Sequence, residues 1–358
     1  MLNFILKRIG YGFLVLLGVI TLVFFLFNVL PGDPAQMMLG QRADKESVEI
    51  IKRDLGLDKP LITQYGYYLN DLSPISFHKK NNNSGLYLDS TKYSYVTLIG
   101  GKENVLVLKQ PYLRRSYQSK RQVTDILAEA FPNTIILAVV SMGFAMVIGV
   151  ILGSLSAIWN GSWFDKANLL ITVIGMSLPS FFAAIVFAWL FAFVLSDYTH
   201  LSMFGSLYSV DDMGNGEYIS LKNIILPAFT LGIRPLAVVS ELTKAAMLEV
   251  LSQDYIRTAR AKGLSYIQVI RRHALKNSMN SVVTAVSGWF ASLLAGAVFV
   301  EYIFDWKGVG VVIVDGLEKY DFPVVMGALL IICVLLVLVN IIVDILYGVL
   351  DPRVRIDK

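Results

Sequence analysis

Six apolar runs dominate this chain of 358 residues, each close to the roughly 20 residues that an α-helix needs to cross a bilayer. The composition agrees, because 55% hydrophobic and 16% charged residues is far more apolar than a typical soluble domain. The sequence therefore predicts an all-α polytopic membrane protein with six transmembrane helices: Ile9–Leu30, Thr134–Ile158, Ala167–Leu195, Ile224–Ala246, Val282–Val300 and Val324–Leu350. Glycine and proline within these runs, such as Gly143, Gly149, Gly153 and Pro179, are tolerated where neighbouring helices approach closely or re-satisfy freed carbonyl groups.

The first run could be mistaken for a secretory signal peptide, since Lys7 and Arg8 precede it. It is longer than the usual apolar region of such a peptide, and the LPGDPA sequence at Leu30–Ala35 resembles no small-residue cleavage site. We therefore interpret residues 1–30 as an uncleaved N-terminal transmembrane helix.

The distribution of basic residues predicts the orientation, because short cytoplasmic loops carry an excess of Lys and Arg. With the N-terminus inside, the cytoplasmic side collects Lys7, Arg8, Lys166, Arg257, Arg260, Lys262, Arg271, Arg272, Lys276, Arg353, Arg355 and Lys358. The short outer loops hold only Lys222, Lys307 and Lys319. Both termini are therefore expected in the cytoplasm, with residues 351–358 as a cytoplasmic tail, residues 31–133 outside, and residues 134–350 as the transmembrane core.

The external segment 31–133 changes in composition along its length. The sequence around Leu55–Leu72 predicts a short helix followed by a second one that begins after Pro60. Between residues 73 and 111, two β-rich runs flank Gly100 and Gly101, which is typical of a β-hairpin. We expect a small mixed insertion there.

Motifs for catalysis are missing from the sequence. The only Gly-Lys dipeptide, Gly101-Lys102, is followed by Glu103 and not by the Ser or Thr of a P-loop. The three histidines are far apart and offer no metal-ligand spacing, and a net charge of +4 is too small to indicate nucleic acid. The sequence therefore predicts no enzyme, no metal and no cofactor of its own.

The loop at about residues 247–281, between the fourth and fifth runs, is basic and amphipathic. A helix written through Ile256, Gly263, Ile267, Ile270 and Ala274 carries one apolar stripe, and the arginines and lysines fall mostly on other faces. Ala259, four residues before Gly263, makes a small-residue step that another surface could approach. The residues themselves leave two alternatives open, contact with anionic lipid headgroups and docking of a partner.

Four stretches of the sequence carry a family resemblance. The TARAKGL and RHALKN stretches at Thr258–Asn277 resemble the EAA loop of ATP-binding-cassette (ABC) importer permeases, in the form found in the dipeptide/oligopeptide (DppB/OppB-like) branch. The sequences LPGDPA, EYIFDWKGVG with DFPVVMG, and VNIIVDILYGVLDPRVR are also similar to that branch. The resemblance covers most of the chain and implies the type I ABC importer permease fold.

The resemblance also implies a function and partners. The chain would be a permease subunit in the cell membrane that forms half of the path for di- or oligopeptides. Its partners would be a second homologous permease, two cytoplasmic ATPase subunits and an external solute-binding protein, with lipid around it and ATP hydrolysis on the ATPase subunits. The loop would couple to the ATPase through Tyr255, Arg257, Thr258, Ala259, Arg260, Lys262 and Gly263.

Three features depart from the family's pattern. Arg257 stands at the acidic position of the general EAA pattern, and His273 and Lys276 replace its distal Ile and Pro. Lys307 stands where the branch usually has Pro, before Gly308. The stretch 73–111 has no counterpart in shorter members.

Charged residues within or beside the apolar runs are candidates for function, because burying a charge in a bilayer is costly. Arg234 is near the middle of the fourth run, with Glu241 on the same face, and we expect both to line the translocation path. The alternative for Arg234 is a structural ion pair or a site kept wet by Pro235. Glu301 and Asp305, at the outer end of the fifth run, suit contact with the binding protein or plain solvation.

Other functions remain open to the sequence. The same branch includes permeases for nickel and other small solutes. A secondary transporter driven by an ion gradient would also be apolar, although no inverted repeat is evident. A membrane-anchored scaffold with an external binding segment is a third class.

Overall fold

A computed structural model describes residues 2–29, 48–49, 52, 58–80, 86–89, 92–210 and 216–350 of the chain. The contacts divide it into two compact units. The first consists of residues 1–12, 130–311 and 334–358, and the second of residues 13–129 and 312–333. The predicted LPGDPA motif at Leu30–Ala35, the Asn-rich stretch 81–85 and the tail 351–358 lie outside the described residues.

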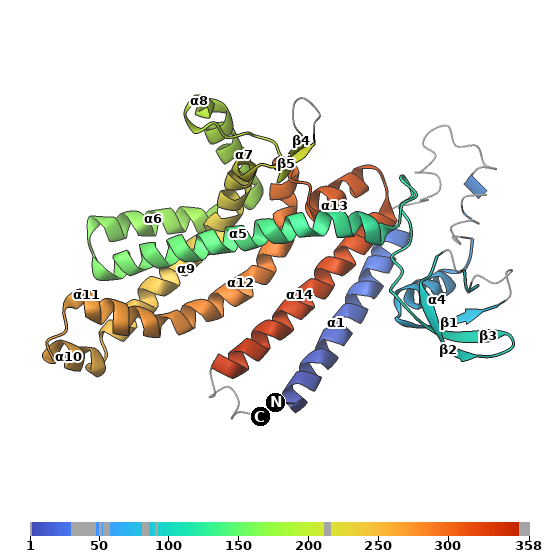
Figure 1. Cartoon of the computed structure of the whole chain (residues 1–358), viewed down its shortest axis with the longest axis horizontal. Coiled ribbons are helices and arrows are strands. Elements are labelled where there is room, and N and C mark those ends of the chain that lie inside the picture. Colours follow the sequence, from blue (N-terminus) through green and yellow to red (C-terminus); the bar gives the residue numbers. More distant parts are fainter. Residues whose placement is uncertain are drawn as a thin grey trace. The chain divides into compact units, whose positions relative to one another are not determined.

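The helices follow the apolar runs of the sequence (Figure 1). The long ones are α1 (Leu2–Val29), α5 (Val123–Ile158), α9 (Ile225–Leu251), α12 (Leu275–Ile303) and α14 (Phe322–Leu350). Shorter ones are α4 (Leu61–Leu72), α6 (Trp163–Ser177), α7 (Ser180–Trp189), α8 (Ser196–Thr199), α10 (Asp254–Ala261), α11 (Tyr266–Val269) and α13 (Val309–Glu318). The described residues also form two π-helical turns, η2 (Leu190–Val194) and η4 (Ile270–Ala274), and a 3₁₀ turn, η3 (Leu221–Ile224).

The part of the chain that the structure describes contains helices that could span a membrane. Four helical segments there are long and apolar enough to cross a membrane, and a bent helix pair raises the number to five. The four are Leu6–Asn28, Val123–Ile158, Leu221–Leu251 and Phe322–Val343. The chain is therefore a mostly helical multi-pass protein, while the count of six and the orientation stay predictions.

One predicted span is not a continuous helix. The run Ala167–Leu195 forms α6 and α7, which are bent by 113° at Leu178 and Pro179. Leu178 has an extended ψ of 127°, because the ring of a following proline disfavours the helical conformation of the residue before it. The expectation that Pro179 is simply tolerated inside a helix was therefore wrong.

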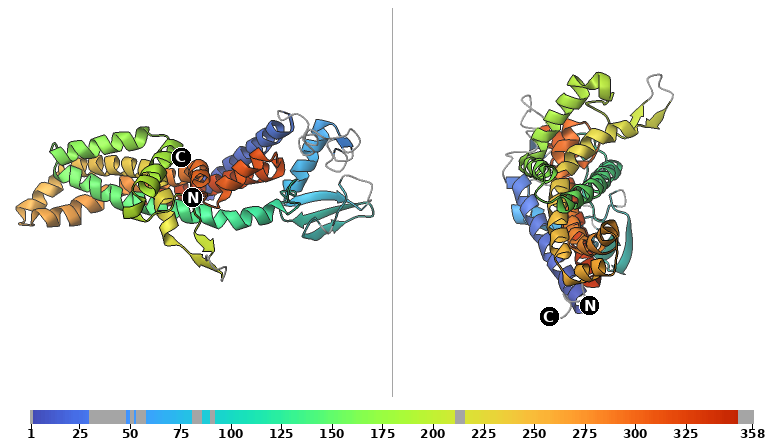
Figure 2. Two further views of the ribbon diagram at one scale, coloured as in Figure 1. Left: turned by 90° about the horizontal axis from the view of Figure 1, so that it is seen from above. Right: turned by 90° about the vertical axis from the view of Figure 1, so that its left-hand side faces the viewer.

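In the first unit, α9 packs closely against α5 and α6 (Figure 2). A Cβ atom added at Gly149 would lie 2.9 Å from the carbonyl oxygen of Leu236, and one at Gly232 would lie 2.8 Å from that of Ser141. Gly153 likewise faces the Ser240 backbone. The sequence-based expectation of close helix approach is confirmed at Gly149 and Gly153, whereas a Cβ at Gly143 would meet nothing within 4 Å.

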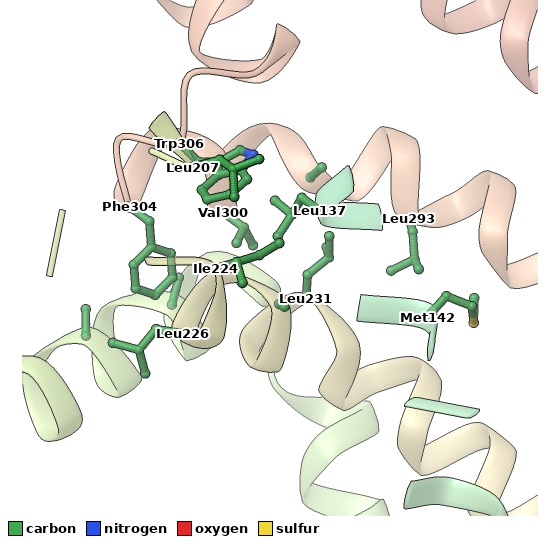
Figure 3. Close-up of a cluster of buried hydrophobic side chains, with 14 residues drawn as sticks. Leu137, Met142, Leu207, Ile224, Leu226, Leu231, Leu293, Val300, Phe304 and Trp306 are labelled. Carbon is green, nitrogen blue, oxygen red and sulfur yellow. The ribbon is translucent and has the colours of Figure 1, made fainter. Parts of the chain in front are cut away.

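The apolar core of the first unit lies where α5, α7, α9 and α12 meet (Figure 3). Large buried members include Leu137, Leu231, Phe304 and Trp306, of which Trp306 is fully buried. Burying a side chain of this size contributes roughly 1.5 to 3 kcal/mol where the alternative is exposure to water. The core therefore fixes the ends of these helices relative to one another.

The turn from α12 to α13 closes over this core. Trp306 donates its indole N–H to the Asn133 carbonyl oxygen at 2.9 Å, and Asn133 Nδ2 donates to the Lys307 carbonyl oxygen at 2.8 Å. Lys307, where the family resemblance implies a proline, is thus held through its backbone carbonyl. Glu301 is completely buried here, so the expectation that it contacts solvent or an external protein was wrong.

The second unit contains a small antiparallel sheet with the order β1-β3-β2. Its strands are β1 (Ile75–Lys79), β2 (Tyr95–Gly100) and β3 (Asn104–Lys109). β2 and β3 form a hairpin in which the Gly101 N–H donates to the Asn104 carbonyl oxygen at 2.9 Å. The sequence did not reveal β1, whose alternation places Ser76 and His78 on the buried face.

A second feature that the sequence did not reveal is a hairpin of β4 (Tyr208–Val210) and β5 (Glu217–Ile219) in the first unit, before α9. Asn223 braces its base, because Asn223 Nδ2 donates to the Ser206 carbonyl oxygen at 2.9 Å.

The DFPVVMG motif has a structural role in the second unit. The buried carboxylate of Asp321 accepts hydrogen bonds from the Ser116 hydroxyl at 2.5 Å and from the Tyr117 N–H at 2.9 Å. Asp321 thus anchors the loop before α5 at the start of α14.

Candidate functional site

The basic loop between α9 and α12 folds as two short helices, α10 and α11, followed by the π-turn η4 that leads into α12. In Figure 1 it lies at the lower left, at the end of α9 and α12. The predicted single helix through Ile256 and Ala274 was therefore wrong. The helix is interrupted between Ala261 and Tyr266, because Gly263 adopts a left-handed φ of 82° that ends α10.

The loop has its own small core. Ile256 and Ala259 of α10 and Val269 of α11 are buried, and Val250, Leu251 and Leu264 pack against them. The predicted apolar stripe is right at Ile256, Ile270 and Ala274, which are buried, and wrong at Ile267, which is 68% exposed. Ala259 faces this core and is buried. It therefore does not offer the surface for close approach of a partner that the sequence suggested.

Gly263 has a different structural role from that of Ala259. It lies on the surface, and a Cβ added there would meet nothing within 4 Å. Its positive φ is a conformation that side chains other than glycine and asparagine adopt at a cost. Within this chain Gly263 is therefore required for the turn and not for close packing.

Side-chain contacts fix the two helices around the turn. Ser265 and Gln268 form a capping box at the start of α11, with the Ser265 N–H donating to Gln268 Oε1 at 3.0 Å. The guanidinium of Arg260 lies 5.4 Å from the ring centroid of Tyr266, a cation–π contact across the turn. Asn277 Nδ2 donates to the Tyr255 hydroxyl at 2.9 Å, which ties α10 to the start of α12.

The exposed face of the loop combines aromatic, aliphatic and basic groups. Of the candidate coupling residues, the structure exposes Tyr255, Arg257, Thr258, Arg260, Lys262 and Gly263. Two further large side chains are exposed, Tyr266, which the sequence analysis did not single out, and Ile267, which it assigned to the apolar stripe. The Ser-x-x-Gln spacing of Ser265 and Gln268 is a helix-start signal that could have placed them on a separate helix.

The candidate path residues are on α9. Arg234 is exposed, and its guanidinium carbon lies 5.7 Å from the ring centroid of Trp289 on α12. Glu241 is half-buried two turns along the same helix. In the described part of the chain Arg234 makes no ion pair, so the alternative of a structural ion pair is not what the structure shows.

Comparison with known proteins identifies the family. The family described as "Binding-protein-dependent transport system inner membrane component" matches residues 149–356, and its N-terminal counterpart matches residues 1–83. The first match contains the whole loop described above.

Several curated relatives match over the full length, and two of them illustrate the range of names. The chain is 34% identical over 369 residues to the di/tripeptide transport system permease protein DppB of Pseudomonas aeruginosa, covering 99% of both chains. It is 33% identical over 356 residues to the glutathione transport system permease protein GsiC of Escherichia coli K12, again covering 99% of both. The chain therefore belongs to the DppB/OppB-like family of ABC importer permeases, which are multi-pass proteins of the inner membrane.

Proposed function

We propose that this chain forms half of the translocation path of an ATP-driven importer for di- or oligopeptides. Two relatives that match at full length are named for short peptides, one for di- and tripeptides and one for glutathione. The second half of the path would come from a homologous permease. An external solute-binding protein would deliver the substrate, consistent with the family's description.

The observation that carries the mechanism is the architecture of the loop at Asp254–Asn277. Ile256, Ala259 and Val269 form an internal core, and a face of aromatic and basic groups that also includes Ile267 is exposed. Such a preformed surface loses little conformational entropy when a partner binds. We infer that this face docks on a cytoplasmic ATPase subunit. With six spans, both termini of the permease would then lie in the cytoplasm.

Coupling requires that the ATPase binds two conformations of the permease with different affinities, so that a change in the ATPase shifts the permease from one conformation to the other. ATP binding would draw the ATPase subunits together, displace the loop and open the path to the other side. Arg234 and Glu241 would line that path, with Arg234 in reach of a peptide carboxylate. In this mechanism the chain would have six spans and would share the translocation path with the second permease.

The test is assembly and uptake with the complete set of partners. The chain is co-expressed with the second permease, the ATPase subunits and the binding protein, and the purified complex is placed in proteoliposomes. We expect vanadate-sensitive, ATP-dependent uptake of a labelled dipeptide or of glutathione. Uptake driven by an ion gradient without ATPase subunits would instead establish a secondary transporter. Uptake of nickel but of neither peptide would show that the substrate is a metal ion and not a peptide.

The docking face is tested with matched variants. Ile267→Asp places a charge on the exposed apolar part of the face, and we expect it to lose co-purification with the ATPase. Ile219→Asp is the control, since Ile219 is 59% exposed on β5, outside the loop. Equal co-purification of both variants with the ATPase would contradict the assignment.

A further inference from the structure

A largely buried ion pair joins α6 to α9 close to the candidate coupling loop. Asp165 Oδ1 and Lys244 Nζ are 2.6 Å apart, and their side chains are only 8% and 18% exposed. The other carboxylate oxygen of Asp165 accepts the N–H of Gly161 at 2.9 Å. One carboxylate thus holds the turn after α5, the start of α6 and the last turns of α9.

A second polar contact lies one turn away on both helices. Asn168 Nδ2 donates to the Ser240 hydroxyl at 3.0 Å, and both side chains are buried. Gly153 of α5 faces the backbone of the same Ser240. α5, α6 and α9 are therefore joined at one level by contacts with defined geometry.

Close packing continues from this level into the loop. Met247 follows Lys244 by three residues, is fully buried, and packs with Ala157 of α5 and with Ile270 and Ala274 of η4. α9 ends at Leu251 and α10 begins at Asp254, so no flexible linker separates the ion pair from the loop.

Stability alone does not explain a buried ion pair here, because a well-packed apolar pair in such a place is often as stable or more stable. What an ion pair adds is a fixed register between two helices. We propose that Asp165 and Lys244 are positioning residues for coupling. They hold α6 to α9, so that a displacement of the loop by the ATPase moves α5, α6 and α9 as one body.

This inference rests on the proposed docking of the loop on an ATPase subunit, and the decisive quantity is solute taken up per ATP hydrolysed. In the reconstituted complex we expect Lys244→Met to keep assembly and basal ATP hydrolysis while this ratio falls about 10-fold. Asp165→Asn, which keeps an acceptor for Gly161, should act in the same direction. Lys244→Arg should retain most of the ratio, because it keeps the charge.

The control is Lys319→Met, since Lys319 forms an exposed ion pair with Asp315 at 3.2 Å and should leave the ratio unchanged. An unchanged ratio in Lys244→Met would overturn the proposal. So would a parallel fall of ATP hydrolysis and uptake in the assembled complex, which would mark the pair as merely structural. If Lys244→Met does not assemble, the ratio in Asp165→Asn decides.

A second measurement does not depend on the substrate. Spin labels are placed at Leu170→Cys on α6 and Gln253→Cys before α10, in a Cys333→Ser background, and their distance is measured without nucleotide and after vanadate trapping. We expect the same distance in both states, and a nucleotide-dependent change once Lys244→Met is added. A change already present without Lys244→Met would show that α6 and the loop do not move together. If the complex transports no peptide, the proposed substrate fails while this measurement still tests the ion pair.

Discussion

The carboxylate of Glu301 accepts the backbone N–H of Gly310 at 2.6 Å, so the last turn of α12 and the first turn of α13 share one buried contact. A Cβ atom at Gly308 would lie 2.5 Å from the Glu301 carboxylate, and one at Gly310 would lie 2.5 Å from the Val298 Cα. The two glycines of the EYIFDWKGVG motif are therefore needed to admit the glutamate.

Gly310→Ala should destabilise the purified protein by about 1 to 3 kcal/mol, because the new methyl group meets backbone atoms that cannot move away. The measurement is thermal unfolding in detergent, compared with Gly288→Ala, at which a Cβ would meet nothing within 4 Å. Equal melting temperatures for the two variants would show that the turn can relax.

Gly263→Asp should abolish uptake and uncouple ATP hydrolysis, while membrane insertion stays normal, because it places an acidic group in the basic face of the loop. Gly263→Asn is the matched control, since asparagine has the same shape and tolerates the left-handed conformation of this residue. We expect Gly263→Asn to keep most of the uptake. Intact transport in the Asp variant would rule out the coupling role.

Arg234→Gln should erase a preference for peptides with a free C-terminal carboxylate, if Arg234 lines the path. The measurement compares uptake of one dipeptide with a free and with an amidated C-terminus. Trp289→Leu removes the aromatic ring that the guanidinium contacts and keeps the charge, so it should keep the preference. A preference that survives in Arg234→Gln would leave the arginine with a structural role.

Asp321→Ala should loosen the loop before α5, because the Ser116 hydroxyl and the Tyr117 N–H lose their acceptor. Leaving such groups unpaired costs about 1 to 3 kcal/mol. Hydrogen exchange at Tyr117 reports the change directly. Asp315→Ala is the control, since its ion pair with Lys319 is exposed and is worth about 0 to 1 kcal/mol.

The sheet of the second unit should weaken as the pH falls below about 6.5, the usual pKa of histidine. Burial lowers the pKa of His78, and the charge of Lys109 acts in the same direction, against weaker opposing contributions that include Asp71. The unfolded segment therefore binds a proton before the folded one does, so stability is lost as the pH falls from that value toward the lowered pKa.

Hydrogen exchange of the β1 and β3 amides at pH 7.5 and 5.5, corrected for intrinsic rates, measures this loss. His78→Gln should remove the pH dependence, because glutamine does not titrate. A dependence that persists in His78→Gln would have to come from another group.

Apolar run length and charge placement were enough to predict a helical multi-pass protein, because the bilayer imposes both on any spanning chain. The motifs were enough to predict the family and the stretch that contains the candidate loop. A single sequence could not show which members of a motif face inward. Ala259 and Gly263 occur in one short motif, yet one packs in a core and the other sets a turn.

What only the tertiary structure decided depends on contacts between distant residues. The ion pair of Asp165 with Lys244 and the hydrogen bond from Ser116 to Asp321 each join segments that lie far apart in the sequence. Local composition determines whether a segment is helical and apolar. Its partner across an interface is determined by the packing of the whole chain, which leaves no local signal in the sequence.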